Sequence, residues 1–427
     1  MRPLPSVVLT GALALTAAAL AVPAGADDAR PGADRAPVGV HAAADRPDGR
    51  VLGTRLPQTS DGVVGPAAHD VPAARRGTTS TAPQRRAAAR QVAPGVTVQT
   101  WNEATSRGPI RAHLTTIKWR TPGLSLDYAN AGKVGATATL GAMIRREGAT
   151  TVAGVNGDFF DIGRTGAPLG LGRDRERGLL HGPRDGWNAA FSIDKAGNPD
   201  IGSRATFASV VQYPGVTITN FNSPTVRPNG VGVYRPSWGR ASGTRWTDGQ
   251  TTNVRVVQIV QGRVTSNGTR VPTQGFKGIL LVGRGTGAKQ LAAMKRGTKA
   301  KVTWNVQAYP RMAITGNKTL LEDGVMTVVD DREMHPRTAI GIDRDTQSLL
   351  LLVVDGRQSF SRGYTMVELA EKMIDLGAEE ALNLDGGGSS TMMSRVLSGA
   401  GYAVVNSPSD GRQRSVANAI VVKYRKP

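Results

Sequence analysis

An apolar run that ends abruptly in an acid and three glycines constrains the fold of this chain most. Residues 381–384 are Ala-Leu-Asn-Leu, and they are followed by Asp385, Gly386, Gly387 and Gly388. Such a run predicts a buried strand that brings one carboxylate to the rim of a sheet. Glycines permit backbone conformations and close approaches that other residues cannot adopt. The strand is therefore expected to end in a tight turn beside Asp385.

The same glycine turn predicts a site for anionic oxygens. Successive backbone N–H groups in such a turn form a nest for anions, and Ser389 and Ser390 add hydroxyl donors. A carboxylate beside an anion nest suits chemistry on an anionic substrate. A plain glycine-rich hairpin turn is the alternative interpretation of these residues.

The elements before this turn predict a core that mixes strands and helices. Residues 338–343 and 349–354 are apolar strands, and the second is apolar throughout and therefore central. Residues 365–376 place apolar side chains on one helical face, and Thr365 and Glu368 form a capping box.

A strand–helix–strand unit follows from this order. A right-handed crossover would make residues 349–354 and 381–384 parallel neighbours. Asp355 and Asp385 would then share one rim, where open α/β sheets bind ligands. We therefore expect an α/β (mixed α+β) fold with a mixed sheet around a strand–helix–strand C-terminal core.

The middle of the chain has a different composition. Residues 203–306 are short alternating runs rich in Val, Thr, Gly and Asn, which predict a β-rich inserted subdomain. Residues 254–264 predict a hairpin that turns at Gln261 and Gly262. Residues 139–148 and 288–295 predict short helices.

The N-terminal part resembles a targeting segment and a linker. Residues 1–26 have the positive start, the apolar stretch and the small-residue cleavage site of a signal peptide. Residues 27–94 are rich in Ala, Pro and Arg without apolar periodicity, which predicts a disordered arm. Residues 95–427 would then form the folded domain. We expect a secreted, extracellular protein without a transmembrane anchor.

Charge and cysteine content narrow the chemistry. The chain has no cysteine, which excludes disulfides, thiol catalysis and Cys-ligated zinc. The formal charge is +20, so the surface favours polyanions such as phosphate-bearing wall or capsule polymers, and cell-wall association. An arginine-rich composition without functional meaning explains the charge equally well. Nucleic acid is disfavoured, because no recognised binding motif occurs and aromatics are only 5%.

Four acids could form an oxygen site for a divalent cation, although no spacing demands one. These are Asp158 and Asp161 after the strand at residues 151–155, together with Asp355 and Asp385. Calcium or magnesium would suit such ligands. Turn formation alone also explains Asn and Asp after a strand. We expect no required cofactor and leave a divalent cation open.

Several motifs together resemble the phosphodiester glycosidase family. They are the Asn-Gly-Asp-Phe-Phe string at 156–160, Pro-Arg-Thr-Ala-Ile-Gly at 336–341, Asp-Gly at 355–356, the string at 383–392, and Ser-Pro-Ser-Asp at 407–410 with Arg414. The resemblance covers roughly residues 95–427. Asp158 departs from it, because the family usually has glycine there, so the family's substrate does not carry over.

The resemblance implies hydrolysis of the bond between a sugar's anomeric carbon and a phosphodiester oxygen. The substrates would be sugar-1-phosphodiesters of cell-wall, capsule or teichoic-type glycopolymers. Asp385 would be the essential carboxylate, with Asp355 or Asp158 as the second acid. The remaining candidates would bind phosphate, sugar hydroxyls or carboxylates: Asn156, Asn383, His335, Arg337, Thr338, Gly386, Gly387, Gly388, Ser389, Ser390 and Arg414.

Two other functions fit the same residues. A metal-dependent phosphodiesterase would break the P–O bond of the same polymers, and a non-catalytic protein would bind wall glycans through its basic surface. The enzymatic interpretation depends on one expectation about geometry. Asp385, Arg337 and Asn156 should line a single open hollow.

Overall fold

The computed structural model describes residues 88–184, 187, 189–396 and 401–427. The predicted signal peptide and the arm up to residue 87 lie outside the described residues. The described residues all belong to one compact unit. Within them, no helix is long and apolar enough to cross a membrane.

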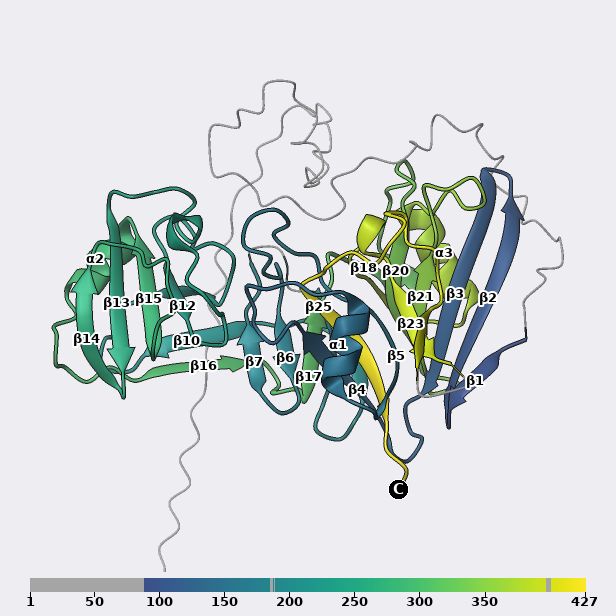
Figure 1. The fold of residues 1–427 in the computed structure, drawn as a ribbon, viewed down its shortest axis with the longest axis horizontal. Coiled ribbons are helices and arrows are strands. Elements are labelled where there is room, and N and C mark those ends of the chain that lie inside the picture. Colours follow the sequence, from purple (N-terminus) through teal and green to yellow (C-terminus); the bar gives the residue numbers. More distant parts are fainter. Residues whose placement is uncertain (1–87, 185–186, 188, 397–400) are drawn as a thin grey trace, which may run out of the picture. The chain divides into compact units, whose positions relative to one another are not determined.

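The largest sheet, called the large sheet below, has eight strands, and every neighbouring pair in it is antiparallel (Figure 1). Its first strand uses residues that the sequence placed in the arm, because their backbone pairs with the next strand. In spatial order the strands are β1 (Arg90–Ala93), β2 (Val96–Thr105), β3 (Gly108–Lys118), β21 (Ser348–Val354), β20 (Arg337–Asp343), β22 (Glu380–Asn383), β18 (Lys318–Glu322) and β19 (Val325–Met326).

A second sheet of five strands, called the small sheet below, is also antiparallel throughout. Its central strand β5 is buried along its whole length. The spatial order is β24 (Tyr402–Val404), β23 (Met392–Arg395), β5 (Thr151–Asn156), β25 (Asn418–Tyr424) and β4 (Leu124–Asn130).

The two sheets pack face to face, and a helix covers the outer face of each. Ile340 and Leu351 from the large sheet share one core cluster with Val155 and Ile420 from the small sheet. Helix α3 (Met366–Asp375) packs on the outer face of the large sheet, and α1 (Leu140–Glu147) packs on that of the small sheet. β21 is covered on both faces, and it is accordingly apolar from Leu349 to Val354.

The expected parallel neighbours are separated by a third strand. β20 lies between β21 and β22 and is antiparallel to both, with Ala339 opposite Leu352 on one side and Asn383 on the other. The expectation was wrong because β20 and β21 form a hairpin first, and the chain then crosses over that hairpin through α3. The fold is therefore strand-rich, with three α-helices in the described residues.

Local signals predicted several elements well. Thr365 and Glu368 form the expected capping box of α3. Thr139 caps α1, which ends before Gly148. The hairpin β13 (Val254–Val260) and β14 (Arg263–Gly268) turns at Gln261 and Gly262, both at positive φ. Helix α2 (Thr286–Ala292) begins two residues earlier than expected.

Two paired strands delimit most of the proposed insertion, β10 (Thr206–Val210) and β16 (Val302–Val306). Between them lies a five-stranded sheet that contains the single parallel pair among the described strands, β11 with β12. The order is β11 (Ile218–Phe221), β12 (Val231–Tyr234), β15 (Ile279–Arg284), β13 and β14.

A further sheet of five strands completes the described part. Its strand β17 pairs with β6 and β8, so residues before and after the proposed insertion lie together. Its order is β7 (Gly178–His181), β6 (Gly172–Asp174), β17 (Met312–Thr315), β8 (Ala189–Ile193) and β9 (Pro199–Ser203).

Candidate functional site

The glycine loop begins where β22 ends, at the same edge of the large sheet as the first residue of β20. The amide of Gly387 donates to the carbonyl of Pro336 at 2.9 Å, and Gly387 has a φ of 57°. A side chain at Gly388 would collide with Arg414 and Asp410. The sequence signal for a tight turn is therefore confirmed, because at two of the three positions a residue with a side chain would be strained or would clash.

Asn156 fastens this loop to both sheets. Its Nδ2 donates to the carbonyl of Asp385 at 2.6 Å, and its Oδ1 accepts from Thr338 Oγ1 at 2.9 Å and from the amide of Thr391 at 3.0 Å. The hydroxyl of Thr338 also lies 3.3 Å from that of Ser390. Asn156 and Thr338 thus position the loop rather than face a ligand.

Asp158 is buried next to Asp385. Its Oδ2 accepts from the amide of Gly170 at 2.7 Å, while its Oδ1 is buried without a hydrogen-bond partner in the described part of the chain. Burial raises the pKa of Asp158 well above its usual value, and the nearby charge of Asp385 raises it further. Such a carboxyl holds its proton to a higher pH than an exposed aspartate does.

A buried histidine that the sequence did not single out holds the backbone that binds Asp158. His181 donates from Nδ1 to the carbonyl of Gly170 at 2.7 Å, and its Nε2 accepts from the hydroxyl of Tyr128 at 2.9 Å. Burial lowers the pKa of His181 to about 4, so the ring is neutral at pH 7. Gly170 is thereby held on both sides, which fixes the donor that faces Asp158.

Asp355 is engaged by protein groups through both carboxylate oxygens. Oδ2 lies 3.1 Å from Nε2 of His113, and Oδ1 accepts from Nδ2 of Asn406 at 3.2 Å and from the amide of Ser407 at 2.8 Å. The same Asn406 nitrogen donates to the carbonyl of Ser390. Asp355 therefore supports the glycine loop through Asn406, and Asp158 is the stronger candidate for the second acid.

Two of the predicted phosphate ligands are held by the protein itself. Arg337 is 3% exposed and donates to the backbone carbonyls of Tyr364 at 2.9 Å and Glu333 at 3.0 Å. Arg414 makes two hydrogen bonds to Asp410, at 2.8 and 3.1 Å. Both guanidiniums are thus oriented by fixed partners.

His335 belongs to a buried side-chain network. Its Nδ1 accepts from Nη2 of Arg357 at 2.7 Å, so its Nε2 carries the hydrogen that is donated to Glu333 at 3.2 Å. The ring is 2% exposed. These contacts orient the segment before β20, so the ring of His335 is held by protein groups.

Asn383 and Ser389 each have one buried oxygen without a partner in the described residues. The Nδ2 of Asn383 donates to Asn317 Oδ1 at 2.7 Å, whereas its Oδ1 has no partner. The hydroxyl of Ser389 also has none. Buried polar groups are nearly always hydrogen-bonded, so Ser389 Oγ and Asp158 Oδ1 are candidate ligand contacts.

Three arginines that the sequence reasoning missed, called the arginine trio below, are Arg164, Arg184 and Arg227. The pKa of Arg184 is lowered, first by burial and also by the charges of the other two, while Asp161 and Asp248 oppose this shift. In the described part of the chain the guanidinium of Arg184 makes no hydrogen bond. Concentrated positive charge of this kind attracts an anion.

Two backbone hydrogen bonds connect Arg184 of the arginine trio to the residue that follows Asp158. The amide of Arg184 donates to the carbonyl of Leu169 at 2.7 Å, and the amide of Leu169 donates to the carbonyl of Phe159 at 2.9 Å. Phe159 directly follows Asp158. Arg227 comes from the proposed insertion, which therefore contributes to this region.

The sequence left open an oxygen site for a cation formed by Asp158, Asp161, Asp355 and Asp385. Among the described residues no group of three or more His, Cys, Asp or Glu side chains is arranged to hold a metal ion. Asp161 instead accepts two hydrogen bonds from Thr165, at 2.6 Å from its hydroxyl and 3.2 Å from its amide.

The structure brings Asp385 and Asn156 into contact and places Arg337 at the neighbouring strand end. Asp385, Asp158, Asn156 and Arg337 are each at most 3% exposed. None of them lines the open cleft that is described below. These four side chains are therefore buried where β5, β20 and β22 bring their ends together.

Comparison with known proteins supports the assignment of the C-terminal part. Residues 242–423 match the family model of the phosphodiester glycosidases, a range that includes the glycine loop but neither Asp158 nor Arg184. An uncharacterized SPbeta prophage-derived protein of Bacillus subtilis, YomE, is 35% identical over 98 residues. That segment is 23% of this chain and 14% of the relative.

Two solved structures share the fold. A hypothetical protein from Synechocystis has a TM-score of 0.64 and 22% identity over 79% of this chain and 63% of its own. A protein of Burkholderia pseudomallei K96243, whose name describes it as exported, has a TM-score of 0.59 and 22% identity over 74% of both chains. The resemblance seen in the sequence is confirmed for residues 242–423, which match the phosphodiester glycosidase family.

Proposed function

We propose that the protein is a secreted glycosidase that hydrolyses the bond between a sugar's anomeric carbon and a phosphodiester. Its substrates would be sugar-1-phosphodiesters of cell-wall, capsule or teichoic-type glycopolymers. The observation that carries the proposal is the pair of buried carboxyls, Asp158 and Asp385, beside the glycine loop. The family match of residues 242–423 supports the same reaction class.

The two carboxyls have different roles in this proposal. Carboxyls that lie close together do not both ionise readily, and a pair whose environments differ divides acid and base roles. The raised pKa of Asp158 assigns the proton to this residue. Asp385 then acts as the carboxylate at the oxocarbenium-like centre, as a nucleophile or as the base for water. Asn156 holds the backbone of Asp385 in place.

The leaving group needs little protonation. A phosphomonoester has a second pKa of about 6, so it leaves more easily than a sugar alkoxide. Fixed donors and positive charge can stabilise it in a site from which water is excluded. Arg184 is the best candidate for this role, because its guanidinium makes no hydrogen bond within the described residues. Ser389 Oγ is a second candidate donor.

The test is product analysis with purified full-length protein on a panel of α- and β-sugar-1-phosphodiesters. In water labelled with heavy oxygen, we expect the label in the released sugar, because C–O cleavage adds water to the anomeric carbon. Label in the phosphate would instead show P–O cleavage, the phosphodiesterase reaction. Polymer binding without any released reducing end would indicate a glycan-binding protein. The Asp385→Asn variant is the control for contaminating activity.

A further inference from the structure

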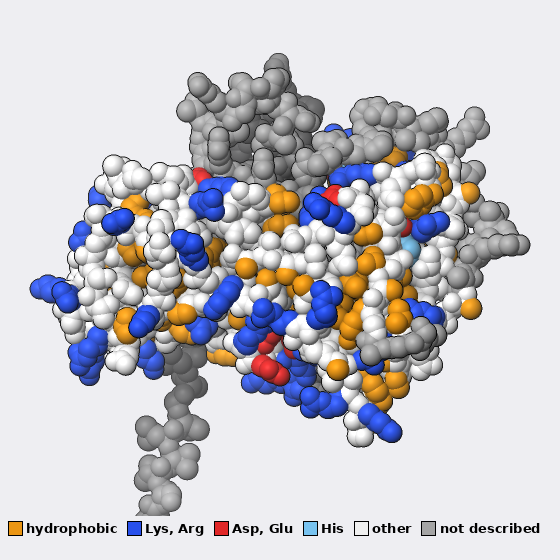
Figure 2. Space-filling model, in the orientation of Figure 1, with side chains coloured by type: hydrophobic (Ala, Val, Ile, Leu, Met, Phe, Trp, Pro, Cys, Tyr) orange, Lys and Arg blue, Asp and Glu red, His pale blue; other side chains and the backbone are white. Residues whose placement is uncertain are grey.

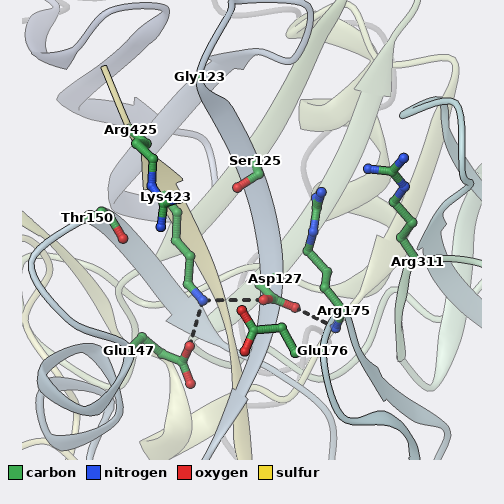
Figure 3. A pocket seen from close by; sticks show the side chains of 10 residues that line it. All are labelled: Gly123, Ser125, Asp127, Glu147, Thr150, Arg175, Glu176, Arg311, Lys423 and Arg425. Atoms are coloured by element: carbon green, nitrogen blue, oxygen red, sulfur yellow. Dashed lines mark hydrogen bonds and ion pairs between the residues drawn. The ribbon is translucent and has the colours of Figure 1, made fainter. Parts of the chain in front are cut away.

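A cleft of about 490 Å³ opens where β4 begins and β25 ends (Figure 3). Alternate residues of these two strands form its floor, and Ser125 lies opposite Lys423 in the strand register. The end of α1, the turn between β6 and β7 and the residue before β17 supply its walls. The charged lining residues are Asp127, Glu147, Arg175, Glu176, Arg311, Lys423 and Arg425.

One lysine pairs with two of the three acids that line the cleft. Lys423 Nζ donates to Glu147 Oε2 at 2.7 Å and to Asp127 Oδ2 at 3.3 Å. Figure 3 shows this lysine between the two carboxylates. The centre of the cleft is therefore a pre-formed ion-pair network that a ligand need not rearrange.

Two arginines at the cleft are left for a ligand. Arg311 and Arg425 are exposed, and in the described part of the chain their guanidiniums make neither an ion pair nor a hydrogen bond. A guanidinium presents planar, paired donors that match phosphate or carboxylate oxygens. These two side chains therefore suit an anionic group.

The remaining lining excludes other ligand classes. The residues that line the cleft include no aromatic side chain and no large aliphatic one. A neutral sugar ring would have no surface on which to stack, and an apolar ligand would bury no apolar area. Ser125, Thr150 and the Lys423 network can accept or donate hydrogen bonds to hydroxyls. The chemistry favours a hydroxyl-rich anion.

The cleft and the carboxyl pair lie at opposite ends of one strand. Thr150 lines the cleft and directly precedes β5, and Asn156 ends β5 and holds the backbone of Asp385. Six residues of strand span about 20 Å. A glycan chain of several repeats is long enough to extend from one site to the other.

We propose that this cleft is a second binding site for an anionic, phosphate-bearing glycan chain, with Arg311 and Arg425 as its phosphate ligands. The residues that line the cleft support anion binding by themselves, whereas the use of the cleft for a polymeric substrate rests on the proposed function. The site would retain a polymer near the carboxyl pair between successive cleavages. Polymeric substrates would gain from it, and a single sugar-1-phosphodiester would not.

The test uses full-length protein carrying Asp385→Asn, so that the polymer is not consumed, and measures binding by titration calorimetry. The probes are a phosphodiester-linked polysaccharide, neutral dextran and inorganic phosphate. Replacing both cleft arginines, Arg311→Gln with Arg425→Gln, should weaken polysaccharide binding about five- to tenfold, the scale of two exposed charged contacts. The matched control replaces two exposed arginines of the proposed insertion, Arg270→Gln with Arg296→Gln, and should change it less than twofold.

Three results would overturn the cleft proposal: unchanged polysaccharide binding in the cleft variant, an equal loss in the control, or dextran binding as strong as that of the polysaccharide. Inorganic phosphate that binds as tightly as the polymer would show a site for the free ion only. With Asp385 intact, the cleft variant should keep its kcat/KM on a small sugar-1-phosphodiester. Cleft-dependent binding without turnover of any substrate would refute the proposed function and leave the cleft proposal standing.

Discussion

The two ends of β5 carry the same residue types in opposite electrostatic settings. At one end Asp158 and Asp385 lie buried together, and burial and a second carboxyl raise the pKa of Asp158 well above its usual value. At the other end Asp127 and Glu147 share Lys423. The pKa of Asp127 is also raised, by burial and by Asp174, but Lys423 opposes the shift.

This difference teaches that a nearby cation decides what a pair of acids can do. Lys423 lies between Asp127 and Glu147, and its charge opposes the rise in the pKa of Asp127. At Asp158, burial and the charge of Asp385 both raise the pKa. A pair of carboxyls whose environments differ in this way can supply a general acid and a base. Lys and Arg side chains are spread over the whole face shown in Figure 2. The basic surface therefore does not favour one end of β5 over the other.

Asp385→Asn should have the largest effect on the carboxyl pair. We expect kcat on a sugar-1-phosphodiester to fall about a thousandfold or more, because the proposed nucleophile or base is removed. Circular dichroism and the melting temperature should stay close to the wild type, because the contacts of Asp385 with Asn156 and Gly157 use its backbone. Near-normal turnover in the purified variant would refute the assignment.

Asp158→Asn should lower activity by about a hundredfold, at the low end for an acid catalyst, because phosphate is a good leaving group. It should also change the pH dependence of stability. The folded-state pKa of Asp158 lies above its unfolded value, so the wild type loses stability as pH rises from about 4 towards that raised pKa. The variant should not share this loss.

Thermal melts of both proteins from pH 4 to pH 9 test the linkage. The melting temperature of the Asp158→Asn variant should rise relative to that of the wild type as pH increases through this range. Parallel curves would show that Asp158 does not have a raised pKa. That outcome would remove the contrast between the two ends of β5.

Arg184→Gln tests the arginine trio and should have a smaller effect. We expect KM for a small sugar-1-phosphodiester to rise about tenfold, because one charged contact to phosphate is lost. Arg184→Lys should restore part of this affinity, since a point charge remains. An unchanged KM in the glutamine variant would place the phosphate elsewhere.

Lys423→Met tests the other end of β5 and should have the smallest effect on catalysis. Unfolding free energy at pH 7 should fall by about 1–2 kcal/mol, because two partly buried carboxylates lose their cation. The deficit should shrink at acid pH, where Asp127, whose pKa is raised by burial, becomes protonated. Denaturant titrations at pH 7 and pH 4 measure it. A large loss of kcat on a small substrate would mean that the two ends do not act separately.

The sequence predicted the parts of the fold that local chemistry determines. The capping box of Thr365 and Glu368, the caps of α1 and the turn at Gln261 and Gly262 depend on residues within a few positions of one another. β21 can pair with β20 through a hairpin or with β22 through the crossover, and no local sequence pattern decides between these two pairings. The expected adjacency of β21 and β22 was wrong for this reason, whereas both strands are antiparallel to β20 and so run in the same direction, as expected.

The same limit applies to the candidate site. Asp385 and the glycine loop were identified because one short string carries the acid, the turn and the donors. The partners of Asp355 could not be found in this way, because His113 lies 242 positions away in an ordinary strand pattern. His181 and Arg184 belong to no recognised motif. Only the folded chain shows that His181 contacts Gly170 and that Arg184 lies near Arg164 and Arg227.

The β10–β16 pair has an evolutionary consequence. The chain enters and leaves the inserted stretch at neighbouring positions, with Thr206 opposite Val306. A single insertion, exchange or deletion can therefore change the length of that stretch without altering the packing of the large sheet on the small sheet. Arg227 travels with that stretch. Descendants can therefore acquire new ligand preferences while the inherited aspartates and their loop stay untouched.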